Sequence, residues 1–330
     1  MSVESSHQTV RRVFLHYPAL FQPRTITSLG NRGGFSGARL WRWDCGLGEL
    51  CLRSWPPDMT TESLALQHTL AYRARSAGLA YVPAVYPCAE GTTWVRHEER
   101  LWQIEKWMPG AADFVTNPSA DRLRAACVAL AQLHRCWKSW SSPSGPCPAV
   151  QRRIARAREW LGLIASGWIP SANVDETLQA LIQRANRLLA YLVPQVAHLL
   201  AAWTDGDFQL QPCLCDIWHD HILYMGETVT GLVDYGGIKI DHVSVDIARM
   251  LGSMVGADRE QWQTGLSAYR TICNFSADEE TLSLALDRTG VIIGVVNWLL
   301  WICRDRRQFD DWNGVAQRLS ALVKRLERYN

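Results

Sequence analysis

The sequence lacks an apolar run long enough to cross a membrane. Its longest apolar stretch, residues 291–303, contains Gly294 and Asn297 and falls short of the ~20 residues that a transmembrane helix needs. This stretch therefore predicts a buried helix. The first residues are polar and include no apolar segment like that of a signal peptide, so we expect a cytoplasmic protein.

The sequence also has little net charge. Its 34 Lys and Arg residues nearly balance its 32 Asp and Glu residues, which leaves a formal charge of +2. A charge this small gives no reason to expect nucleic acid or an anionic membrane as a partner, and no feature points to an obligate protein partner. The 10 cysteines have no regular spacing, which favours buried thiols over a disulfide framework.

Two familiar nucleotide-binding motifs are missing as well. No Gly-x4-Gly-Lys-Ser/Thr run occurs, which excludes a P-loop, and no Gly-x-Gly-x2-Gly run opens a helix, which leaves a dinucleotide-binding fold unsupported. Residues 30–37 are instead rich in glycine. There Gly33 and Gly34 would allow backbone N–H groups to approach phosphate groups, although a plain hairpin turn suits the same residues.

What the sequence does contain is a change of periodicity. Residues 25–55, 94–95 and 101–107 alternate like β-strands, around one helical stretch at 61–77. The sequence Met-Pro-Gly at 108–110 then breaks the alternation. Helical spacing follows at 120–137, 152–164, 176–203 and beyond residue 245, with one hairpin at 222–233.

These patterns predict an α+β fold with two lobes. The N-terminal lobe, residues 1–107, contains an antiparallel sheet, and its first dozen or so residues look loosely held. The C-terminal lobe, residues 108–330, is larger and mainly helical.

Two acidic residues, Asp216 and Asp234, flank the expected hairpin. Phosphoryl transfer requires one carboxylate that orients the attacking hydroxyl and a second that holds a metal ion against the nucleotide phosphates. Asp234 follows an apolar strand and precedes two glycines, which suits a carboxylate that reaches a metal ion. Ordinary turns would also suit both residues.

His221 leaves several ligand choices open. Imidazole suits zinc or manganese better than magnesium, so His221 either binds the metal ion or positions Asp216 through a hydrogen bond. Asp220, beside it, offers an oxygen ligand instead. A structural zinc site is disfavoured because the Cys-x-Cys-x3-His-x-His spacing at 213–221 is too compressed.

The residues around this hairpin resemble the aminoglycoside phosphotransferase and choline kinase family. Residues 214–216, Leu-Cys-Asp, stand where the family has His-Gly-Asp, and His221 stands where it has Asn. Residues 233–235, Val-Asp-Tyr, match its Ile-Asp-Phe or Ile-Asp-Trp segment. The resemblance covers about residues 28–250 and is dense over 209–251. It implies a protein-kinase-like fold and an ATP-dependent small-molecule kinase that uses Mg²⁺, or Mn²⁺.

The resemblance also implies roles for individual residues. Asp216 would be the catalytic carboxylate, and His221 and Asp234 would hold the metal ion. The residues expected to bind the nucleotide, besides the two glycines, are Arg53, Glu105, Trp107 and Met108. Arg53 stands where the family has a phosphate-binding Lys, and its carboxylate partner is unclear between the positions of Glu62 and Gln67. Asp246 would brace the catalytic loop or cap a helix.

Three departures from the family pattern support an alternative, a catalytically silent nucleotide-binding module. Arg53 replaces Lys, His221 replaces Asn, and the His-Gly before Asp216 is lost; however, both carboxylates are present. The acceptor is expected to be a small hydroxyl- or amine-bearing molecule. The candidate cleft aromatics are Trp203, Trp218, Trp298 and Trp301, which would contact a cationic substrate through cation–π interactions or simply belong to the core.

Overall fold

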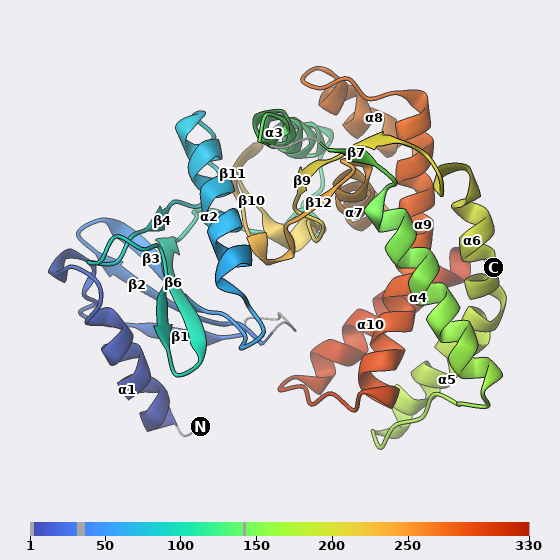
Figure 1. The fold of residues 1–330 in the computed structure, drawn as a ribbon, viewed down its shortest axis with the longest axis horizontal. Helices are drawn as coiled ribbons and strands as arrows, with labels where there is room; N and C mark the ends of the chain where they lie inside the picture. The colour runs from blue at the N-terminus through green and yellow to red at the C-terminus, as the bar shows by residue number, and fades with distance from the viewer. Residues whose placement is uncertain (1–2, 32–36, 141–142, 330) are drawn as a thin grey trace. The chain divides into compact units, whose positions relative to one another are not determined.

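The structure is a computed structural model and describes residues 3–31, 37–140 and 143–329 (Figure 1). The chain forms two compact units. Unit 1 consists of Met1–Trp137 and Asp220–Gly236, and unit 2 consists of Lys138–His219 and Gly237–Asn330. The lobe boundary predicted between residues 107 and 108 falls inside unit 1 and stays a prediction.

Unit 1 is built on an antiparallel sheet, as predicted for the N-terminal lobe. Among the described residues its strands are β1 (Thr27–Gly30), β2 (Arg39–Cys45), β3 (Gly48–Ser54), β4 (Val85–Tyr86), β5 (Val95–His97) and β6 (Arg100–Lys106). Their order is β1-β2-β3-β6-β4, and β5 also pairs with β6. Because side chains alternate along a strand, Leu50, Leu52 and Ile104 are buried on one face, and Arg53 and Glu105 lie on the other.

The N-terminal helix α1 (Val3–Phe14) lies in the segment expected to be loosely held, and that expectation stays a prediction. Val10, Val13 and Phe14 are buried against the face of the sheet that carries Leu50 and Leu52. There the ring of Phe14 packs edge to face on that of Trp43, with ring centres 5.0 Å apart. Apolar residues three and four positions apart form one helical stripe, so the sequence held this signal.

Two further helices of unit 1 begin after polar capping residues. Helix α2 (Thr61–Ser76) starts after Thr60, whose side chain accepts a hydrogen bond from the Ser63 N–H. Helix α3 (Ala120–Lys138) starts after Ser119, whose hydroxyl accepts from the Arg122 N–H. Such caps satisfy N–H groups that a first helical turn leaves unbonded.

The predicted hairpin is present as β10 (Ile222–Met225) and β11 (Thr228–Leu232). It packs on the segment that precedes α3. Tyr224 forms a bridge with Ala111, and the guanidinium of Arg122 lies 4.6 Å from the centre of the Tyr224 ring. The hairpin therefore belongs to unit 1.

Unit 2 is mainly helical, which completes the predicted fold class. Its α-helices in the described residues are α4 (Pro148–Ala165), α5 (Glu176–Leu192), α6 (Val196–Leu199), α7 (Ser244–Val255), α8 (Arg259–Arg270), α9 (Ala277–Leu299) and α10 (Trp312–Leu326). Short strands pair as β7 (Ser144–Gly145) with β8 (Phe208–Gln209) and β9 (Gln211–Cys213) with β12 (Lys239–Asp241). In the part of the chain that the structure describes, the remaining short helices are η1 (Ala19–Phe21), η2 (Val193–Gln195), η3 (Ala201–Trp203), η4 (His219–His221), η5 (Tyr235–Gly237), η6 (Leu300–Arg304) and η7 (Glu327–Tyr329).

The helix predicted over 176–203 is broken in the structure. Helix α5 ends at Leu192, and η2, α6 and η3 follow it. Pro194 explains the break, because proline has no N–H to donate and its ring crowds the preceding helical turn.

The apolar stretch at 291–303 lies in the core of unit 2. Residues Ala277–Arg304 form a helix long and apolar enough to cross a membrane, but 67% of its most apolar window is buried inside the structure. Helix α9 starts with a capping box between Ser276 and Glu279. The expected buried helix is therefore present.

Helix packing in unit 2 gives a first testable prediction. A Cβ atom on Gly252 of α7 would lie 1.8 Å from Oδ1 of Asp287, which pairs with Arg325 at 2.8 Å. Gly252→Ala must displace this half-buried ion pair, so we expect it to lower the free energy of unfolding by at least about 2 kcal/mol, measured by urea denaturation.

Gly162 on α4 is the matched control. No heavy atom lies within 4 Å of the Cβ position at Gly162, and this helical residue is exposed. Gly162→Ala should therefore raise stability by up to about 1 kcal/mol. Equal effects at both positions would contradict the packing argument.

Candidate active site

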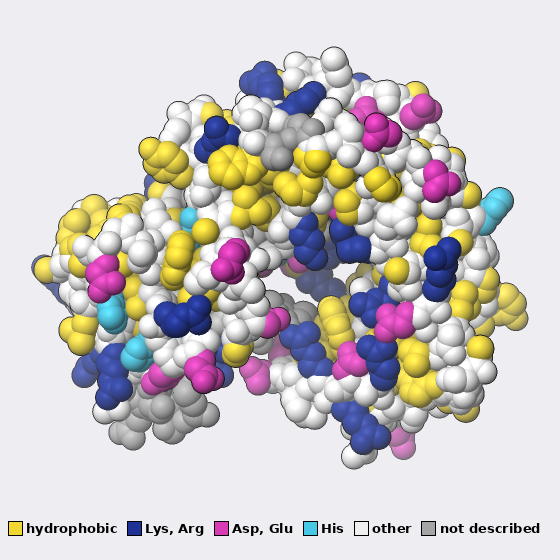
Figure 2. All heavy atoms as spheres, in the orientation of Figure 1, with side chains coloured by type: hydrophobic (Ala, Val, Ile, Leu, Met, Phe, Trp, Pro, Cys, Tyr) yellow, Lys and Arg dark blue, Asp and Glu magenta, His cyan; other side chains and the backbone are white. Residues whose placement is uncertain are grey.

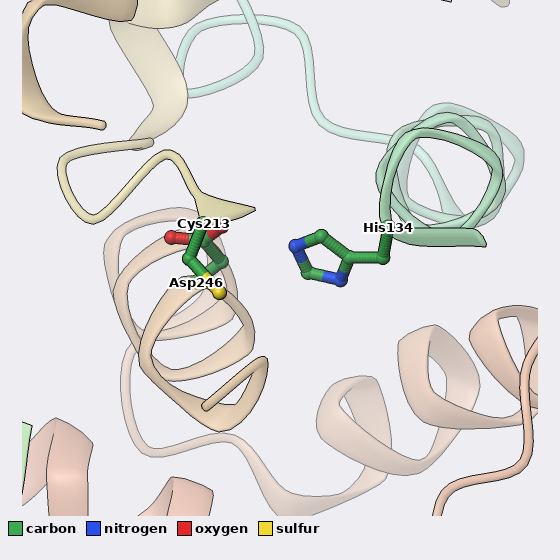
Figure 3. A group of neighbouring side chains, drawn as sticks. All are labelled: His134, Cys213 and Asp246. Atoms are coloured by element: carbon green, nitrogen blue, oxygen red, sulfur yellow. The ribbon is translucent and has the colours of Figure 1, made fainter. Parts of the chain in front are cut away.

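The loop that follows β9 carries Asp216, and a buried carboxylate in unit 2 braces it. Oδ2 of Asp246 accepts a hydrogen bond from the Leu214 N–H at 2.7 Å, and Oδ1 accepts from the Cys215 N–H at 2.6 Å. Asp246 is fully buried in the first turn of α7, beside Cys213 at the end of β9 (Figure 3). The bracing role expected for Asp246 is confirmed.

Two backbone features shape this loop. Cys215 has a φ of 61°, in the left-handed region that favours glycine, and the resemblance places the family's glycine at this position. Gly237 allows close approach, because a Cβ there would lie 2.7 Å from the Leu214 carbonyl oxygen. Backbone strain of this kind persists where the surrounding contacts fix it, and the hydrogen bonds to Asp246 do so here.

Asp216 presents its carboxylate to solvent. The side chain is 56% exposed, and its Oδ1 accepts from Nη2 of Arg249 at 3.0 Å and from Nε at 3.3 Å. Among the described residues no group is bonded to Oδ2. One oxygen is thus held by α7, and the other faces out from the loop, where it could accept a proton.

Asp234 in unit 1 lies between two basic side chains. Nη1 of Arg53 is 3.6 Å from its Oδ1, and Nε2 of His221 is 3.7 Å from its Oδ2. Burial alone would raise the pKa of the Asp234 carboxyl, but the charges of Arg53 and His221 outweigh burial and lower it. Asp234 also has a φ of 66°, so its backbone is held in a conformation that few residues adopt.

The hairpin positions His221 for this contact. The carbonyl of His221 accepts a hydrogen bond from the Val233 N–H at 2.9 Å, which ties the two ends of the hairpin together. The structure therefore brings the two predicted metal ligands, His221 and Asp234, side by side. Asp220 is exposed at the same turn.

Arg53 has a carboxylate partner that the sequence did not reveal. Nε and Nη2 of Arg53, on β3, both lie 3.2 Å from Oε1 of Glu105 on β6. Both side chains are largely buried, at 11% and 13% exposed. Burial opposes the charge on Arg53, yet Glu105 and Asp234 raise the pKa of its guanidinium. The acid comes from the sheet, so neither Glu62 nor Gln67 on α2 supplies it.

Further hydrogen bonds fix Glu105 in turn. Its Oε2 accepts from Nε2 of Gln103 at 2.7 Å, and Oε1 of Gln103 accepts from the Trp55 indole N–H at 2.7 Å. Nε2 of His68, on α2, lies 2.9 Å from the same Gln103 oxygen. Arg53, Trp55, Gln103 and Glu105 occupy alternate positions on neighbouring strands, and that alternation was the available sequence signal.

This network is closely packed. The cavity beside it has a volume of about 20 Å³ and is lined by Arg53, Glu105, His68, Gln67 and Tyr235, among others. A space of that size holds about one water molecule. The guanidinium of Arg53 is therefore held mainly by protein contacts.

The network also fixes the protonation of His68. Because Gln103 offers an oxygen, the Nε2 atom of His68 must carry the proton, and Nδ1 then accepts from the Thr93 hydroxyl at 2.6 Å. Burial, only partly offset by the hydrogen bond to Gln103, lowers the pKa of His68 to about 4. The imidazole is neutral at pH 7.

A pH-dependent stability follows from this shift. The pKa of His68 is near 6.5 in the unfolded chain, so between pH 6.5 and pH 4 the unfolded chain binds a proton that the folded protein does not. We expect the free energy of unfolding to fall by about 2 kcal/mol from pH 7.5 to pH 5 through this residue.

Urea denaturation at the two pH values measures the effect. His68→Gln keeps a donor for Gln103 and should reduce the pH-dependent loss by that amount. His198→Gln, at an exposed position on α6, is the control and should leave the loss unchanged. The explanation is wrong if both variants behave like the wild type.

The other residues predicted to bind the nucleotide make contacts within the protein. The backbone N–H of Trp107 donates to the Glu49 carbonyl at 3.0 Å. The guanidinium of Arg42 lies over the Trp107 ring, 4.8 Å from its centre. Met108 is buried beside Gly231 of the hairpin. These contacts do not test nucleotide binding, so both residues stay predictions. Gly33 and Gly34 lie outside the described residues.

Comparisons with known proteins give a family match and similar solved structures. A model of the phosphotransferase enzyme family matches residues 28–281, whereas no curated protein matches the sequence. Among solved structures, spectinomycin phosphotransferase in complex with ADP and spectinomycin is similar at 12% identity, with a TM-score of 0.74 and 97% of each chain covered.

Two other similar structures are kinases of small amino alcohols by name. A choline/ethanolamine kinase family protein from Mesorhizobium loti shares 16% identity, with a TM-score of 0.62 over 97% of this chain and 94% of that chain. A microcompartment-associated aminopropanol kinase shares 14% identity, with a TM-score of 0.62 over 99% and 97%. At such identities the likeness shows the fold, and it confirms the two-lobed kinase-like architecture.

Proposed function

Because the chain belongs to the phosphotransferase enzyme family, we propose that it transfers the γ-phosphoryl group of ATP to a hydroxyl group of a small molecule. The observation that carries this proposal is the state of Asp216: its loop is braced by Asp246, and one carboxylate oxygen is left exposed. Such a group can accept the hydroxyl proton as the acceptor oxygen attacks.

The reaction balances with the residues of this chain. The acceptor oxygen forms a bond to the γ-phosphorus, the bond between that phosphorus and the ADP oxygen breaks, and the acceptor proton passes to Asp216. Arg53 would bind the phosphates, since its planar guanidinium matches phosphate oxygens, and Glu105 would hold it in place. Trp107 and Met108, which follow Glu105 in the sequence, would lie along the adenine.

The residues around Asp234 fit a divalent metal ion. The carboxyl has a lowered pKa and is 40% exposed, so it offers the ionised oxygens that Mg²⁺ prefers. His221 adds a nitrogen, which suits Mn²⁺ better. Asp234 and His221, or Asp220 in place of His221, would hold the ion, and a bound ion would neutralise phosphate charge during the transfer.

Transfer from ATP to a panel of acceptors tests the proposal. The panel should include amino alcohols, hydroxy acids, sugars and aminoglycosides, with Mg²⁺ and then Mn²⁺, and ADP formation should exceed that without acceptor. A thermal-shift titration with ADP shows nucleotide binding independently of turnover. Absence of both ADP binding and transfer would contradict the proposal. We also propose a cytoplasmic location, since the apolar helix is a core element.

A further inference from the structure

Basic side chains surround the catalytic loop within unit 2. Arg249 on α7 contacts Asp216, and Arg318 on α10 lies over the ring of Trp218, two residues further along the loop. The pictured face of unit 2 as a whole carries both basic and acidic side chains (Figure 2). The cations that lie beside the loop itself are those of Arg249 and Arg318.

Two more cations act on the same loop. Burial raises the pKa of the Cys215 thiol, with Asp246 and Asp241 adding to the rise, whereas the charges of Arg152 and Lys239 oppose it. Arg152 comes from α4 and is paired with the buried Asp241, which offsets its charge. Lys239, on β12 opposite Cys213, is the further basic residue near the loop.

The guanidinium of Arg249 has N–H donors that Asp216 does not use. Its Nε and Nη2 atoms bond Oδ1 of Asp216, its side chain is 41% exposed, and Nη1 has no hydrogen-bond partner among the described residues. A guanidinium carries five N–H donors in a fixed plane. An acceptor whose hydroxyl reaches Asp216 would thus place a neighbouring anionic group against Arg249.

Arginine side chains of the protein already lie over aromatic rings that were predicted to contact a cationic acceptor. The guanidinium of Arg318 lies 3.4 Å from the centre of the Trp218 ring. That of Arg307 lies 5.4 Å from the Trp301 ring and 5.5 Å from the Phe309 ring. A second cation would meet like charge at these faces.

Trp298 and Trp203, the other two candidate aromatic residues, give no further support for a cation–π site. Trp298 is 6% exposed and packs edge to face on Trp301 at 5.2 Å, which makes it a core residue. Trp203 lies in η3, and its ring contacts no cation and no other ring among the described residues. The structure therefore offers little support for a cation–π site beside Asp216.

Acidic side chains nearby are mostly engaged. Asp241 is fully buried and bonded to Arg152, and Asp246 is bonded to two backbone N–H groups. Asp305 pairs with a neighbouring arginine, Asp311 caps α10, and Asp310 is left exposed between them. Asp241 and Asp246 are therefore engaged by the protein and are not open to a cationic acceptor.

Building on the proposed function, we propose that the acceptor carries an anionic group, a carboxylate or a phosphate, next to the hydroxyl that receives the phosphoryl group. Arg249 and Arg318 bind that group while Asp216 takes the hydroxyl proton. Charge-assisted hydrogen bonds to guanidinium groups are stronger than neutral ones, so the anion orients the hydroxyl. The expected class is small hydroxy acids or phosphorylated alcohols.

Three acceptors of similar size differ in charge: glycolate, ethylene glycol and ethanolamine. We expect kcat/KM for glycolate to exceed that for ethanolamine at least tenfold. Glycerate and glycerol phosphate then distinguish a carboxylate from a phosphate. Preference for ethanolamine or for ethylene glycol would overturn the proposal.

Substitutions of Arg318 provide the second test, because the arginine that is bonded to Asp216 is Arg249. Arg318→Gln should raise KM for the anionic acceptor at least tenfold and leave KM for ATP unchanged, and Arg318→Lys should restore part of the loss. Arg156→Gln is the control, since Arg156 on α4 pairs with Glu159 at the surface. An unchanged acceptor KM in Arg318→Gln overturns the proposal.

A binding measurement separates failure of this inference from failure of the proposed function. If none of the acceptors is phosphorylated, calorimetric titration with malonate and with propanediamine still reports which charge the site binds. Malonate binding that is weakened in Arg318→Gln supports the anionic site even though the proposed function fails. Equal malonate binding by the two proteins, no malonate binding, or preference for propanediamine rejects it.

Discussion

Replacing Asp216 with Asn is expected to lower kcat by about 10²- to 10⁴-fold, the usual contribution of a positioned general base. The amide has nearly the same shape as the carboxylate but cannot take up the acceptor proton. The loop should keep its conformation, since Asp246 braces it through the backbone of Leu214 and Cys215. ADP affinity should therefore change by less than about twofold.

Steady-state kinetics with the best acceptor of the panel, together with calorimetric titration of ADP, measures both quantities. Asp205→Asn is the matched control, because Asp205 is an exposed carboxylate of the same unit. Unchanged turnover in Asp216→Asn would show that another group accepts the proton. A large loss of ADP affinity would instead indicate that the substitution disturbs the fold.

Removing the buried pair formed by Arg53 and Glu105 is expected to weaken ADP binding by about 10- to 150-fold. This range corresponds to the 1.5–3 kcal/mol that a hydrogen bond to a charged group contributes, roughly converted to affinity. The variant Arg53→Met with Glu105→Gln removes the guanidinium and leaves no unpaired buried carboxylate, which on its own would destabilise unit 1. Adenosine carries no phosphate, so its affinity should stay the same.

Calorimetric titrations with ADP and with adenosine distinguish a phosphate contact from general damage. Arg96→Met, exposed on β5 of the same sheet, is the control and should bind both ligands normally. Gln103→Leu should give a smaller loss of ADP affinity, because it loosens Glu105 without removing Arg53. Equal losses for ADP and adenosine would show that Arg53 does not bind phosphate.

Much of the candidate site could be read from the sequence because it is local. Asp216, the hairpin and Asp234 follow one another within one short segment, and the elements between them are fixed by alternation and turns. The caps at Thr60 and Ser119 are equally local. A helix cap or a hairpin depends on residues a few positions apart, so the sequence is sufficient to predict it.

Residues paired across the sheet could not be read in the same way. Glu105 stands opposite Cys51 in the register of β3 and β6, and only that register brings its carboxylate to Arg53. His68 adds a third element to the same network. The contact of Arg249 with Asp216 likewise depends on how α7 packs beside β9.

The sequence by itself determined the order of elements, the positions of the two carboxylates and the departures at Arg53, Cys215 and His221. The tertiary structure alone decided what holds them: a carboxylate from β6 for Arg53 and an arginine of α7 for Asp216. It also decided that arginines lie over the aromatic rings. The reason is physical. Local backbone conformation depends on residues that are neighbours in the sequence. Ion pairs and stacked cations depend instead on how segments far apart in the sequence pack together.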